Sequence, residues 1–255
     1  MAAIRRTNLP RRRAAPRVHD LGGMRVLVID IGGTHVKLAI AAGEVRRFDS
    51  GPELTPVALI QQIQALIPDW EFDAVSVGYP GAVGPDGPVE EAGNIGPGWV
   101  GFDFEGEFHR PVRVINDAAL QALGSYDGGR MLFLGLGTGL GSALVAERVV
   151  IRLELGSLEF RASGTIADRL GTDGLAETGE TAWRDTAVHV IDMLGKALSA
   201  DYVVLGGGNA SRLDRLPERT RLAGPDAAFI GGTRLWEQQV EHHDGPPSPT
   251  WRILR

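Results

Sequence analysis

A strand, a glycine-threonine turn and a second strand occur twice in this chain, at residues 25–40 and 131–146. The first copy surrounds Gly32-Gly33-Thr34 and the second surrounds Gly137-Thr138-Gly139, and aliphatic or β-branched residues dominate the flanking strands. The separation of the copies is far too long for a solenoid period. The repeat therefore predicts an α/β protein of two similar lobes that face each other, with both turns at the cleft between them.

The rest of the pattern alternates short apolar runs with amphipathic segments, as α/β folds do. Thr55 followed by Pro56 is a typical helix start, and the apolar residues between Trp183 and Leu194 recur at helical spacing. Further strands are expected at 45–48, 74–77, 112–115, 149–153 and 202–205. Helices are expected at 56–67, from 117 onward, at 181–199, near 211–216 and at 232–240. Residues 84–108 and the tail after His243 read as irregular.

Charge is distributed unevenly along the chain. The first 24 residues hold six arginines and one acidic residue, so the remainder carries a net charge of −11 although the whole chain carries −6. We expect residues 1–24 to be a disordered basic arm, 25–115 a first lobe, 116–243 a second lobe and 244–255 a tail. A body this acidic argues against a general nucleic-acid surface. No run of eighteen apolar residues and no signal-peptide core occur, so a cytoplasmic protein without a membrane partner is expected.

The two glycine-threonine turns are candidate phosphate sites. Glycines allow several backbone amides to converge on one anion, and the hydroxyls of Thr34 and Thr138 can add donors. Lys37, one of only two lysines in the chain, can supply a point charge to a phosphate. Asp30, at the end of the first strand, is placed to hold Mg²⁺ through water. The alternative is that both turns are ordinary tight hairpins.

A third glycine turn, Gly206-Gly207-Gly208-Asn209, follows a strand and precedes a helical segment. Three glycines would let a flat ligand such as a nucleobase lie close to the backbone, and a turn without a ligand is the alternative. The dinucleotide fingerprint fails, because Ser142 stands at its third glycine position after Gly137 and Gly139 and the next segment is strand-like. The P-loop pattern also fails, because no Gly-Lys-Ser/Thr follows the glycines.

Asn116 and Asp117 lie where a strand gives way to a helix. An Asp there can accept a proton from a substrate hydroxyl while the Asn binds a neighbouring hydroxyl, although both types are also preferred helix caps. Asn94, in a glycine-rich loop, and the carboxylates of Glu154 and Glu159 are further candidates for binding sugar hydroxyls. Their alternatives are a routine turn residue and solvated surface carboxylates.

Together these segments resemble the ROK family of sugar kinases and sugar regulators, in the actin-like ATPase superfamily. The resemblance spans about residues 25–241 and rests on the order and spacing of DIGGTHVK, GYPGAV, VINDAALQALG, LGLGTGLGSALV, ELGSLE and VLGGGN. Within the family the chain most resembles the polyphosphate glucokinases, which share its short length, its lack of a zinc-binding cysteine cluster and a segment like NIGPGW. The resemblance implies two actin-like (RNase H-like) lobes with a cleft between them, and no structural zinc.

The resemblance also implies residue roles. Asp117 would be the general base toward the 6-hydroxyl of a sugar. The sugar would be held by Asn94, Asn116 and Glu154, with Ser157 and Glu159 beside it. Mg²⁺ and the phosphates would lie at Asp30, Gly32, Gly33, Thr34 and Lys37. The phosphoryl donor would be clamped by Gly137, Thr138 and Gly139, and its adenosine would lie at Gly206, Gly207, Gly208 and Asn209.

Ser157 departs from the family pattern. Relatives have histidine after the glycine of an ELGH-type segment, where it contacts the sugar, whereas serine is shorter and carries no charge. A further family carboxylate has two rival matches in this chain, Glu159 and Asp168. The departure bears on which sugar is used and on whether the chain is fully active.

The expectation is a hexokinase-type phosphotransferase that uses polyphosphate or ATP, with Mg²⁺, to phosphorylate a hexose, with glucose favoured. The alternatives are a ROK kinase for another hexose or an amino sugar, and a weakly catalytic or non-catalytic sugar sensor. A DNA-binding repressor is disfavoured, because residues 1–24 are too short and proline-rich for a helix-turn-helix. A groove of arginines would favour polyphosphate, the candidates being Arg110, Arg113, Arg130, Arg148 and Arg152. A homodimer is expected, as is common among relatives.

Overall fold

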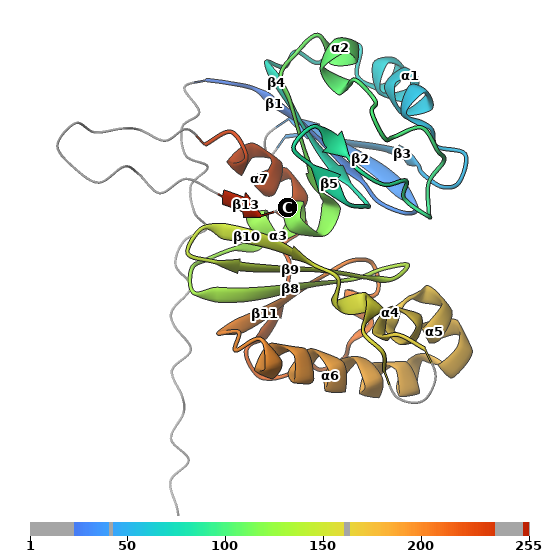
Figure 1. The fold of residues 1–255 in the computed structure, drawn as a ribbon, viewed down its shortest axis with the longest axis vertical. Helices are drawn as coiled ribbons and strands as arrows, with labels where there is room; N and C mark the ends of the chain where they lie inside the picture. Colours follow the sequence, from blue (N-terminus) through green and yellow to red (C-terminus); the bar gives the residue numbers. More distant parts are fainter. Residues whose placement is uncertain (1–22, 41–42, 161–163, 238–251, 255) are drawn as a thin grey trace, which may run out of the picture.

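The computed structural model describes residues 23–40, 43–160, 164–237 and the strand at 252–254. The predictions for the arm before residue 23, and for the helix and tail between 238 and 251, therefore lie outside the described residues. In Figure 1 a first sheet lies at the top, a second sheet lies below it, and two helices lie between them. The α/β class and the two similar lobes predicted from the repeat are confirmed, as are the actin-like lobes that the family resemblance implies.

The first sheet has five strands in the order β3-β2-β1-β4-β7. Strands β1, β2 and β3 form an antiparallel meander, and β4 and β7 continue the sheet in parallel with β1. The bounds are β1 Val26–Ile31, β2 His35–Ile40, β3 Val45–Asp49, β4 Ala74–Tyr79 and β7 Val112–Asn116. Helix α1 (Pro56–Leu66) packs on this sheet and is capped by Thr55, whose hydroxyl accepts the Ala58 amide as the sequence predicts.

The second sheet repeats this plan with the order β12-β11-β8-β9-β10-β13. Strands β8, β9 and β10 are an antiparallel meander, and β11 is parallel to β8 as β4 is to β1. The bounds are β8 Arg130–Leu136, β9 Leu140–Ala146, β10 Val149–Leu153, β11 Tyr202–Gly206, β12 Thr220–Leu222 and β13 Arg252–Leu254. The tail was expected to be irregular, and β13 corrects this, because it pairs in parallel with β10 at the sheet edge.

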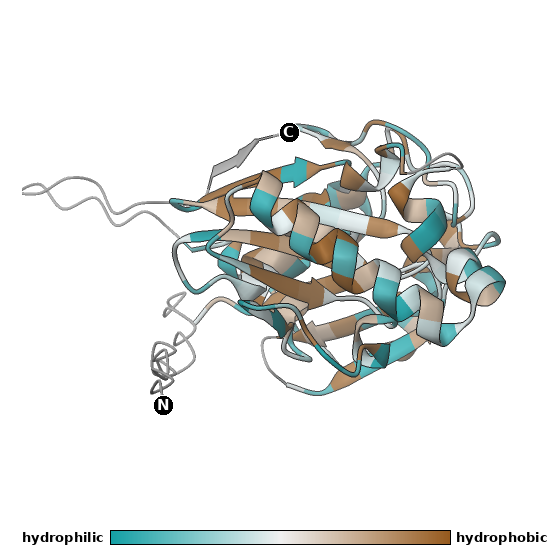
Figure 2. Ribbon diagram, turned by 90° about the horizontal axis from the view of Figure 1, so that it is seen from below, coloured by the Kyte–Doolittle hydropathy of each residue, from teal (hydrophilic) through white to brown (hydrophobic). Residues whose placement is uncertain are grey.

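Helix α6 (Glu180–Ala197) covers the outer face of the second sheet. Seen from below in Figure 2, it lies in front of the sheet and alternates hydrophilic and hydrophobic residues. Its buried residues, Trp183, Ala187, Val190, Ile191 and Leu194, are the apolar face predicted from helical spacing. Among the described residues no helix is both long and apolar enough to cross a membrane.

Short strands and helices occur in the segments between the longer elements. Residues 84–108 hold the two-stranded pair β5 (Val83–Gly84) and β6 (Gly87–Pro88) and the helix α2 (Phe104–Phe108). Between β10 and α6 lie a 3-10 turn (Leu155–Ser157), α4 (Ile166–Leu170) and α5 (Thr172–Thr178). The helix expected near 211–216 is only a 3-10 turn at Ala210–Arg212.

Helices α3 (Asp117–Ser125) and α7 (Ala227–Arg234) cross between the two sheets in close contact. The sequence predicts a helix at 232–240, but α7 begins earlier, at Ala227, and one glycine in each of the two helices permits their close contact. A Cβ on Gly231 would lie 1.9 Å from the Leu120 carbonyl oxygen, and one on Gly124 would lie 1.8 Å from the Ala227 carbonyl oxygen. Tertiary packing therefore outweighs the poor helix propensity of glycine here.

Helix α7 also packs against β1 and β4 of the first sheet. The Ser76 hydroxyl on β4 donates to the Gly232 carbonyl at 2.8 Å, and the buried Arg234 guanidinium donates to the carbonyl of Leu123 near the end of α3 at 2.6 Å. A helix from the range expected for the second lobe thus rests on the first sheet. The boundary between the lobes after residue 115 stays a prediction. Helices α3 and α7 lie between the two sheets and connect them.

Gly231→Ala tests this crossing. The added methyl group meets backbone that cannot move without separating α3 from α7, so the free energy of unfolding should fall by about 2–3 kcal/mol, as measured by urea titration. Gly93→Ala is the control, because a Cβ at Gly93 meets nothing within 4 Å. Equal unfolding free energies for the two variants would contradict the close packing.

Candidate functional site

The first glycine turn joins β1 to β2 and is closed by the Gly32 amide, which donates to the His35 carbonyl at 3.0 Å. The antiparallel register sets Asp30 directly opposite Lys37. Asp30 is buried, with 7% of its surface exposed, whereas Lys37 is exposed. A buried carboxylate and an exposed ammonium group thus lie on adjacent strands beside the turn.

The neighbouring parallel strands bring Asp30 close to Asp117. Asp30 is paired with Gly78 on β4, and Tyr79 on β4 is paired with Asn116 on β7, so α3 begins beside the end of β1. A Cβ on Gly78 would lie 3.5 Å from the Asp30 Oδ1, 3.5 Å from the Asp117 Cα and 2.7 Å from the Leu120 side chain. The missing side chain of Gly78 therefore permits the first turn of α3 to approach Asp30.

This approach perturbs both carboxyl groups. Burial, reinforced by the negative charge of Asp30, raises the pKa of Asp117 to about 7, while the Ala118 amide and Arg152 oppose the rise. Burial also raises the pKa of Asp30 to about 6, and Lys37 opposes it. Two carboxyl groups that titrate near neutral pH in a cleft are typical of a functional site.

Asp30 Oδ1 is buried, and none of the residues that the structure describes gives it a hydrogen bond. An unsatisfied carboxylate oxygen is costly unless a cation or water binds it, so this atom fits the Mg²⁺ role predicted for Asp30. Among the described residues, no group of three or more His, Asp or Glu side chains is placed to hold a metal ion. Mg²⁺ needs fewer, because it is usually bound by one or two carboxylates together with phosphates and water.

The second glycine turn lies opposite the first, as the repeat predicts. A Cβ on Gly33 would lie 3.0 Å from the Thr138 hydroxyl and 2.9 Å from the Asn94 side-chain amide. The carbonyl of Thr138 in turn accepts the Thr172 amide at 3.2 Å, at the start of α5. One residue from each glycine turn and Asn94 from the glycine-rich loop therefore meet at one place.

The third glycine turn is attached to the second. The Asn209 side-chain amide donates to the Gly137 carbonyl at 3.2 Å, and the Asn209 backbone amide donates to the Leu136 carbonyl at 2.9 Å. Gly207 has a φ of +80°, and a Cβ there would lie 2.3 Å from the Leu136 carbonyl oxygen. Only glycine allows this contact, so the third glycine turn is held directly against the second.

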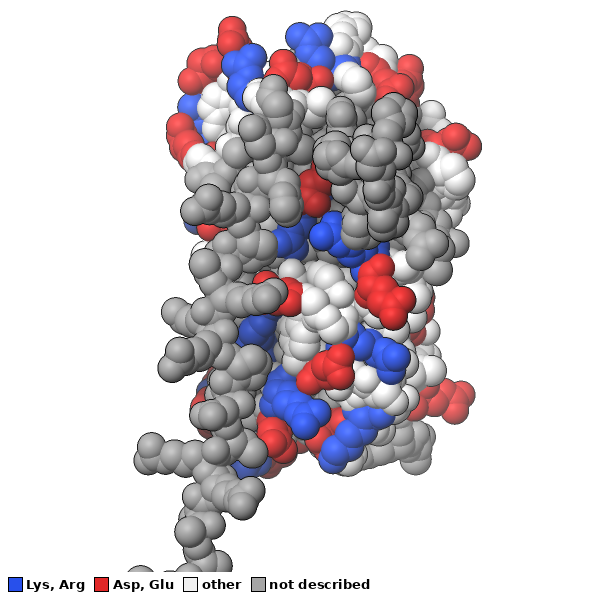
Figure 3. Space-filling model, turned by 90° about the vertical axis from the view of Figure 1, so that its left-hand side faces the viewer, with Lys and Arg blue, Asp and Glu red and all other residues white. Residues whose placement is uncertain are grey.

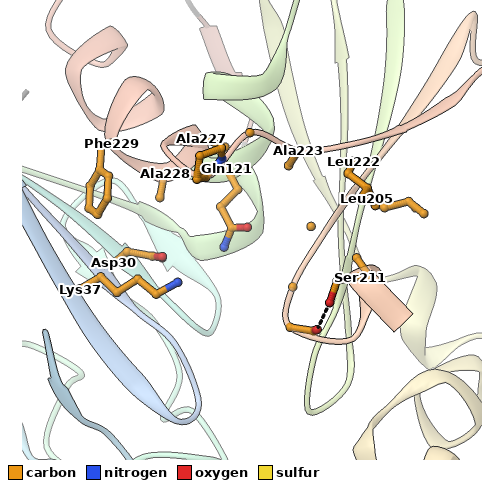
Figure 4. A pocket seen from close by; sticks show the side chains of 16 residues that line it. Asp30, Lys37, Gln121, Leu205, Ser211, Leu222, Ala223, Ala227, Ala228 and Phe229 are labelled. Carbon is orange, nitrogen blue, oxygen red and sulfur yellow. Dashed lines mark hydrogen bonds between the residues drawn. The ribbon is translucent and has the colours of Figure 1, made fainter. Parts of the chain in front are cut away.

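A cavity of about 300 Å³ opens between Asp30 and Lys37 on one side and the third glycine turn on the other. Figure 4 shows Asp30 and Lys37 facing Leu205 and Ser211 across this space, with Gln121 of α3 between them and the start of α7 beside it. The other lining residues are Gly206, Gly207, Gly208, Ala210, Leu222, Ala223, Gly224, Pro225, Ala227, Ala228 and Phe229. The cavity thus has a charged end and a mostly small, apolar end.

The residues predicted to bind sugar lie outside the cavity lining. The Asn116 side chain caps α3 by accepting the Ala119 amide at 3.1 Å and donates to the Gly81 carbonyl at 3.2 Å. Asn116 therefore has a structural role that fixes the position of Asp117, whatever else it binds. Asn94 is half-buried beside the first glycine turn.

Glu154 is exposed at the end of β10, and its carboxylate pairs with the Arg152 guanidinium. The same guanidinium lies 3.6 Å from Glu90, which follows β6 in the first lobe. The Ser157 hydroxyl donates to the Glu154 carbonyl at 2.7 Å. Ser157 and Glu159 are both exposed, and Glu159 forms an isolated bridge with Thr165.

The rival carboxylate Asp168 has a local explanation. It completes a capping box with Thr165 at the start of α4, and hydrogen bonds from Thr165 lower its pKa. Helix capping accounts for this residue without a ligand.

Gln121 and Glu90 were not predicted as site residues, and Arg152 was predicted only as part of an arginine groove for polyphosphate. Gln121 lines the cavity one helical turn after Asp117, and the signal was a single polar residue in the apolar run of α3 at spacing i, i+4. The pairing of Arg152 with Glu90 could not be predicted, because it joins segments that are far apart in sequence. Nothing in the chain pattern indicates which arginine lies beside Glu154.

Comparisons with known proteins agree with this arrangement. The sequence profile of the ROK family matches residues 26–156. The inorganic polyphosphate/ATP-glucomannokinase from Arthrobacter sp. strain KM is 24% identical, with a TM-score of 0.72, over 84% of this chain and 98% of that chain. The comparison with curated proteins finds no match.

Two further solved structures share the fold. One is a ROK family glucokinase from Streptomyces griseus in complex with glucose and AMPPNP, at 15% identity and a TM-score of 0.62, over 83% of this chain and 98% of that chain. The other is a ROK family transcriptional regulator, a homologue of the E. coli MLC protein, at 15% identity and a TM-score of 0.58, over 84% of this chain and 78% of that chain. Both kinases and a regulator therefore share this architecture.

Asp117→Asn should stabilise the protein at neutral to basic pH. The unfolded chain releases this proton near pH 4, whereas the folded chain retains it up to about pH 7, so stability from this group is full below pH 4 and is lost as the pH rises to 7. The variant should therefore exceed the parent in unfolding free energy by on the order of 2 kcal/mol at pH 8 and by less at pH 5.

Urea titrations at the two pH values measure this difference. Asp185→Asn is the matched control, because Asp185 is exposed on α6 and its neutralisation should change little at either pH. A parent and an Asp117→Asn variant of equal stability at pH 8 would show that the Asp117 carboxylate is not destabilised in the cleft.

Proposed function

The chain belongs to the ROK family, and from this premise we propose that it is a sugar kinase that transfers a phosphoryl group to the 6-hydroxyl of a hexose. The observation that carries the proposal is Asp117, a carboxyl group with a raised pKa at the start of α3 and beside the buried Asp30. Asp30 also lines the cavity, together with Lys37 and the third glycine turn. The site thus combines a base with surfaces suited to phosphates.

Asp117 acts as the general base. A general base works best when its pKa lies near the operating pH. The pKa of Asp117 is about 7, well above that of an ordinary carboxyl group. Asp117 takes the proton of the sugar hydroxyl as the oxygen attacks the terminal phosphorus of the donor, and the donor's bridging oxygen leaves with the remaining phosphates. Catalysis by such a site consists mostly of positioning and charge stabilisation.

The two facing glycine turns bind the phosphates. Gly32, Gly33 and Thr34 supply donors from the first lobe, and Gly137, Thr138 and Gly139 supply them from the second. Lys37 adds a positive charge at the charged end of the cavity. Asp30 would hold Mg²⁺, which neutralises phosphate charge when bound.

A nucleoside triphosphate is the favoured donor, and inorganic polyphosphate is the alternative. The cavity supports a nucleotide because it offers a charged end for phosphates and an apolar, glycine-lined end for a base at residues 206–208. The arginines considered for a polyphosphate groove are scattered. Arg130 pairs with Ala146 at the end of β8–β9 remote from the second glycine turn, whereas Arg152 pairs with Ala143 nearer that turn.

Other arginines of the set also serve local structure. The Arg113 guanidinium stacks on Trp236 at 4.2 Å, and Arg110 donates to the Phe72 carbonyl at 3.1 Å. On the face shown in Figure 3, Lys and Arg side chains are interspersed with Asp and Glu rather than gathered in one strip. A long polyanion would meet both signs of charge there.

The acceptor side supports a neutral hexose, with glucose favoured. Asn94, Asn116 and Glu154 are the proposed sugar-binding residues, with Ser157 and Glu159 beside them. The carboxylates of Glu154 and Glu90 both pair with the guanidinium of Arg152. These groups therefore suit the hydroxyl groups of a sugar better than a charged substituent of a sugar. A kinase for another hexose or an amino sugar is the alternative within the family.

A weakly catalytic sugar sensor is the second candidate function. It is favoured by Ser157, which replaces the histidine of relatives. It is also favoured by the ion pair between Arg152 and the Glu154 carboxylate, which engages a proposed sugar-binding group. The ROK regulator with the same fold gives this candidate a precedent. A cytoplasmic homodimer completes the proposal in either case.

A phosphorylation screen separates these candidates. Purified protein is incubated with glucose, mannose, fructose and N-acetylated amino sugars, each with ATP or polyphosphate and Mg²⁺, and sugar phosphate is measured. A kinase gives product with at least one pair, and glucose with ATP is expected to be the best. No product with any pair, together with sugar binding by calorimetry, would favour the sensor.

Asp117→Asn should lower kcat by about 100- to 10,000-fold, because a general base contributes this much, while the KM for the hexose changes little. In the parent, kcat/KM should rise with pH and level off above about pH 7, as Asp117 loses its proton. Asp185→Asn again serves as the control and should keep parental turnover. Parental kcat in Asp117→Asn would refute the role of this residue.

A further inference from the structure

Gln121 is the polar exception on α3. Between Asp117 and Ser125 the helix otherwise contains alanine, leucine and glycine, and Ala118, Ala119, Leu120, Ala122 and Leu123 are buried. None of the described residues gives the Gln121 side-chain amide a hydrogen bond, although the residue is partly buried. Because Gln121 lines the cavity, its amide is available to a bound ligand.

The position of the amide within the cavity is defined on both sides. Figure 4 shows the Gln121 side chain reaching into the space between Asp30 and Lys37 on one side and Leu205 and Ser211 on the other. A Cβ on Gly206 would lie 2.9 Å from the Gln121 Oε1. The third glycine turn therefore leaves room for this side chain, which lies between the charged end and the apolar end.

A nucleoside phosphate has its polar groups in the same order. Its phosphates would lie at Asp30 and Lys37 and its base at the apolar end, so its ribose falls in the middle of the cavity. A carboxamide provides both donors and an acceptor, which match the two hydroxyl groups of a ribose.

We propose that Gln121 is a specificity-determining residue that hydrogen-bonds the ribose hydroxyls of a nucleotide in this cavity. The proposal rests on the nucleotide site of the proposed function and extends it to a named contact. Because inorganic polyphosphate has no ribose, Gln121 recognises one class of donor and not the other. A site built to hydrogen-bond a hydroxyl also discriminates against the analogue that lacks it.

Nucleotide binding without turnover tests the proposal. The probes are ADP and 2′-deoxyADP with Mg²⁺, titrated calorimetrically into the full chain, the Gln121→Met variant and a Gln61→Met control. Met keeps the length and volume of Gln without its polar atoms, and Gln61 is exposed on α1, outside the cavity lining. Thermal unfolding of each variant checks that the fold is kept.

The parent and the Gln61→Met control should bind ADP about tenfold more tightly than 2′-deoxyADP, the effect of roughly one hydrogen bond. In Gln121→Met, ADP should bind about tenfold more weakly than in the parent, and its advantage over 2′-deoxyADP should disappear. If the chain also uses polyphosphate, the KM for polyphosphate should be the same in Gln121→Met as in the parent.

Results of two kinds would overturn the proposal. The first is parental binding of ADP, with the same preference over 2′-deoxyADP, in Gln121→Met. The second is a parent that binds no ADP, or weaker binding in Gln121→Met with an unchanged preference over 2′-deoxyADP, which would place Gln121 at the base or the phosphates. Binding is measured without a sugar, so a chain that passes this test but phosphorylates no hexose fails only the proposed function.

Discussion

The juxtaposition of two carboxyl groups, Asp30 and Asp117, is the constraint on which the rest of the site depends. Burial opposes the ionisation of both groups, and the negative charge of Asp30 further opposes the ionisation of Asp117. Such an arrangement is unfavourable by itself, so the surrounding structure must hold the two carboxyl groups in place. Here that structure is the parallel pairing of β1 with β4 and β4 with β7, which ends beside the start of α3.

The close approach of backbone segments follows from this constraint. Gly78 admits α3 beside Asp30, and Gly124 and Gly231 allow α3 and α7 to touch along their backbones. Helix α7 then binds the first sheet through Ser76 and holds the end of α3 through Arg234. The helix that carries Asp117 is therefore held at both ends, and glycine is needed for this packing as well as in the three glycine turns.

Much of this could be predicted from sequence where the signal is local. The repeated hairpin fixed the two-lobed class, Thr55 marked the start of α1, and the Asn116-Asp117 pair marked a strand-to-helix junction. These features depend on residues close together in the chain. Asp168 was a weaker local signal, and its capping box shows how a carboxylate at a helix start can be purely structural.

The missed features depend on contacts between distant segments. The start of α7 was placed too late, because the packing of Gly231 against Leu120 cannot be read from propensity. The strand β13 needs β10 as its partner, and the Arg152–Glu90 contact joins the two lobes. Gln121 had a periodic signal, but its importance became visible only when the cavity beside it was known.

Site-resolved titration of the carboxyl groups is the most direct test of whether burial and Asp30 together raise the pKa of Asp117. Aspartate carboxyl carbons are labelled with ¹³C and followed by NMR from pH 3 to pH 9 in the parent and in Asp30→Asn, with Asp117→Asn used to assign the signal. The account predicts that Asp117 titrates at about pH 7 in the parent and at a lower pH, still above its ordinary value, in Asp30→Asn. An Asp117 signal that titrates near pH 4 and does not respond to Asp30→Asn would contradict it.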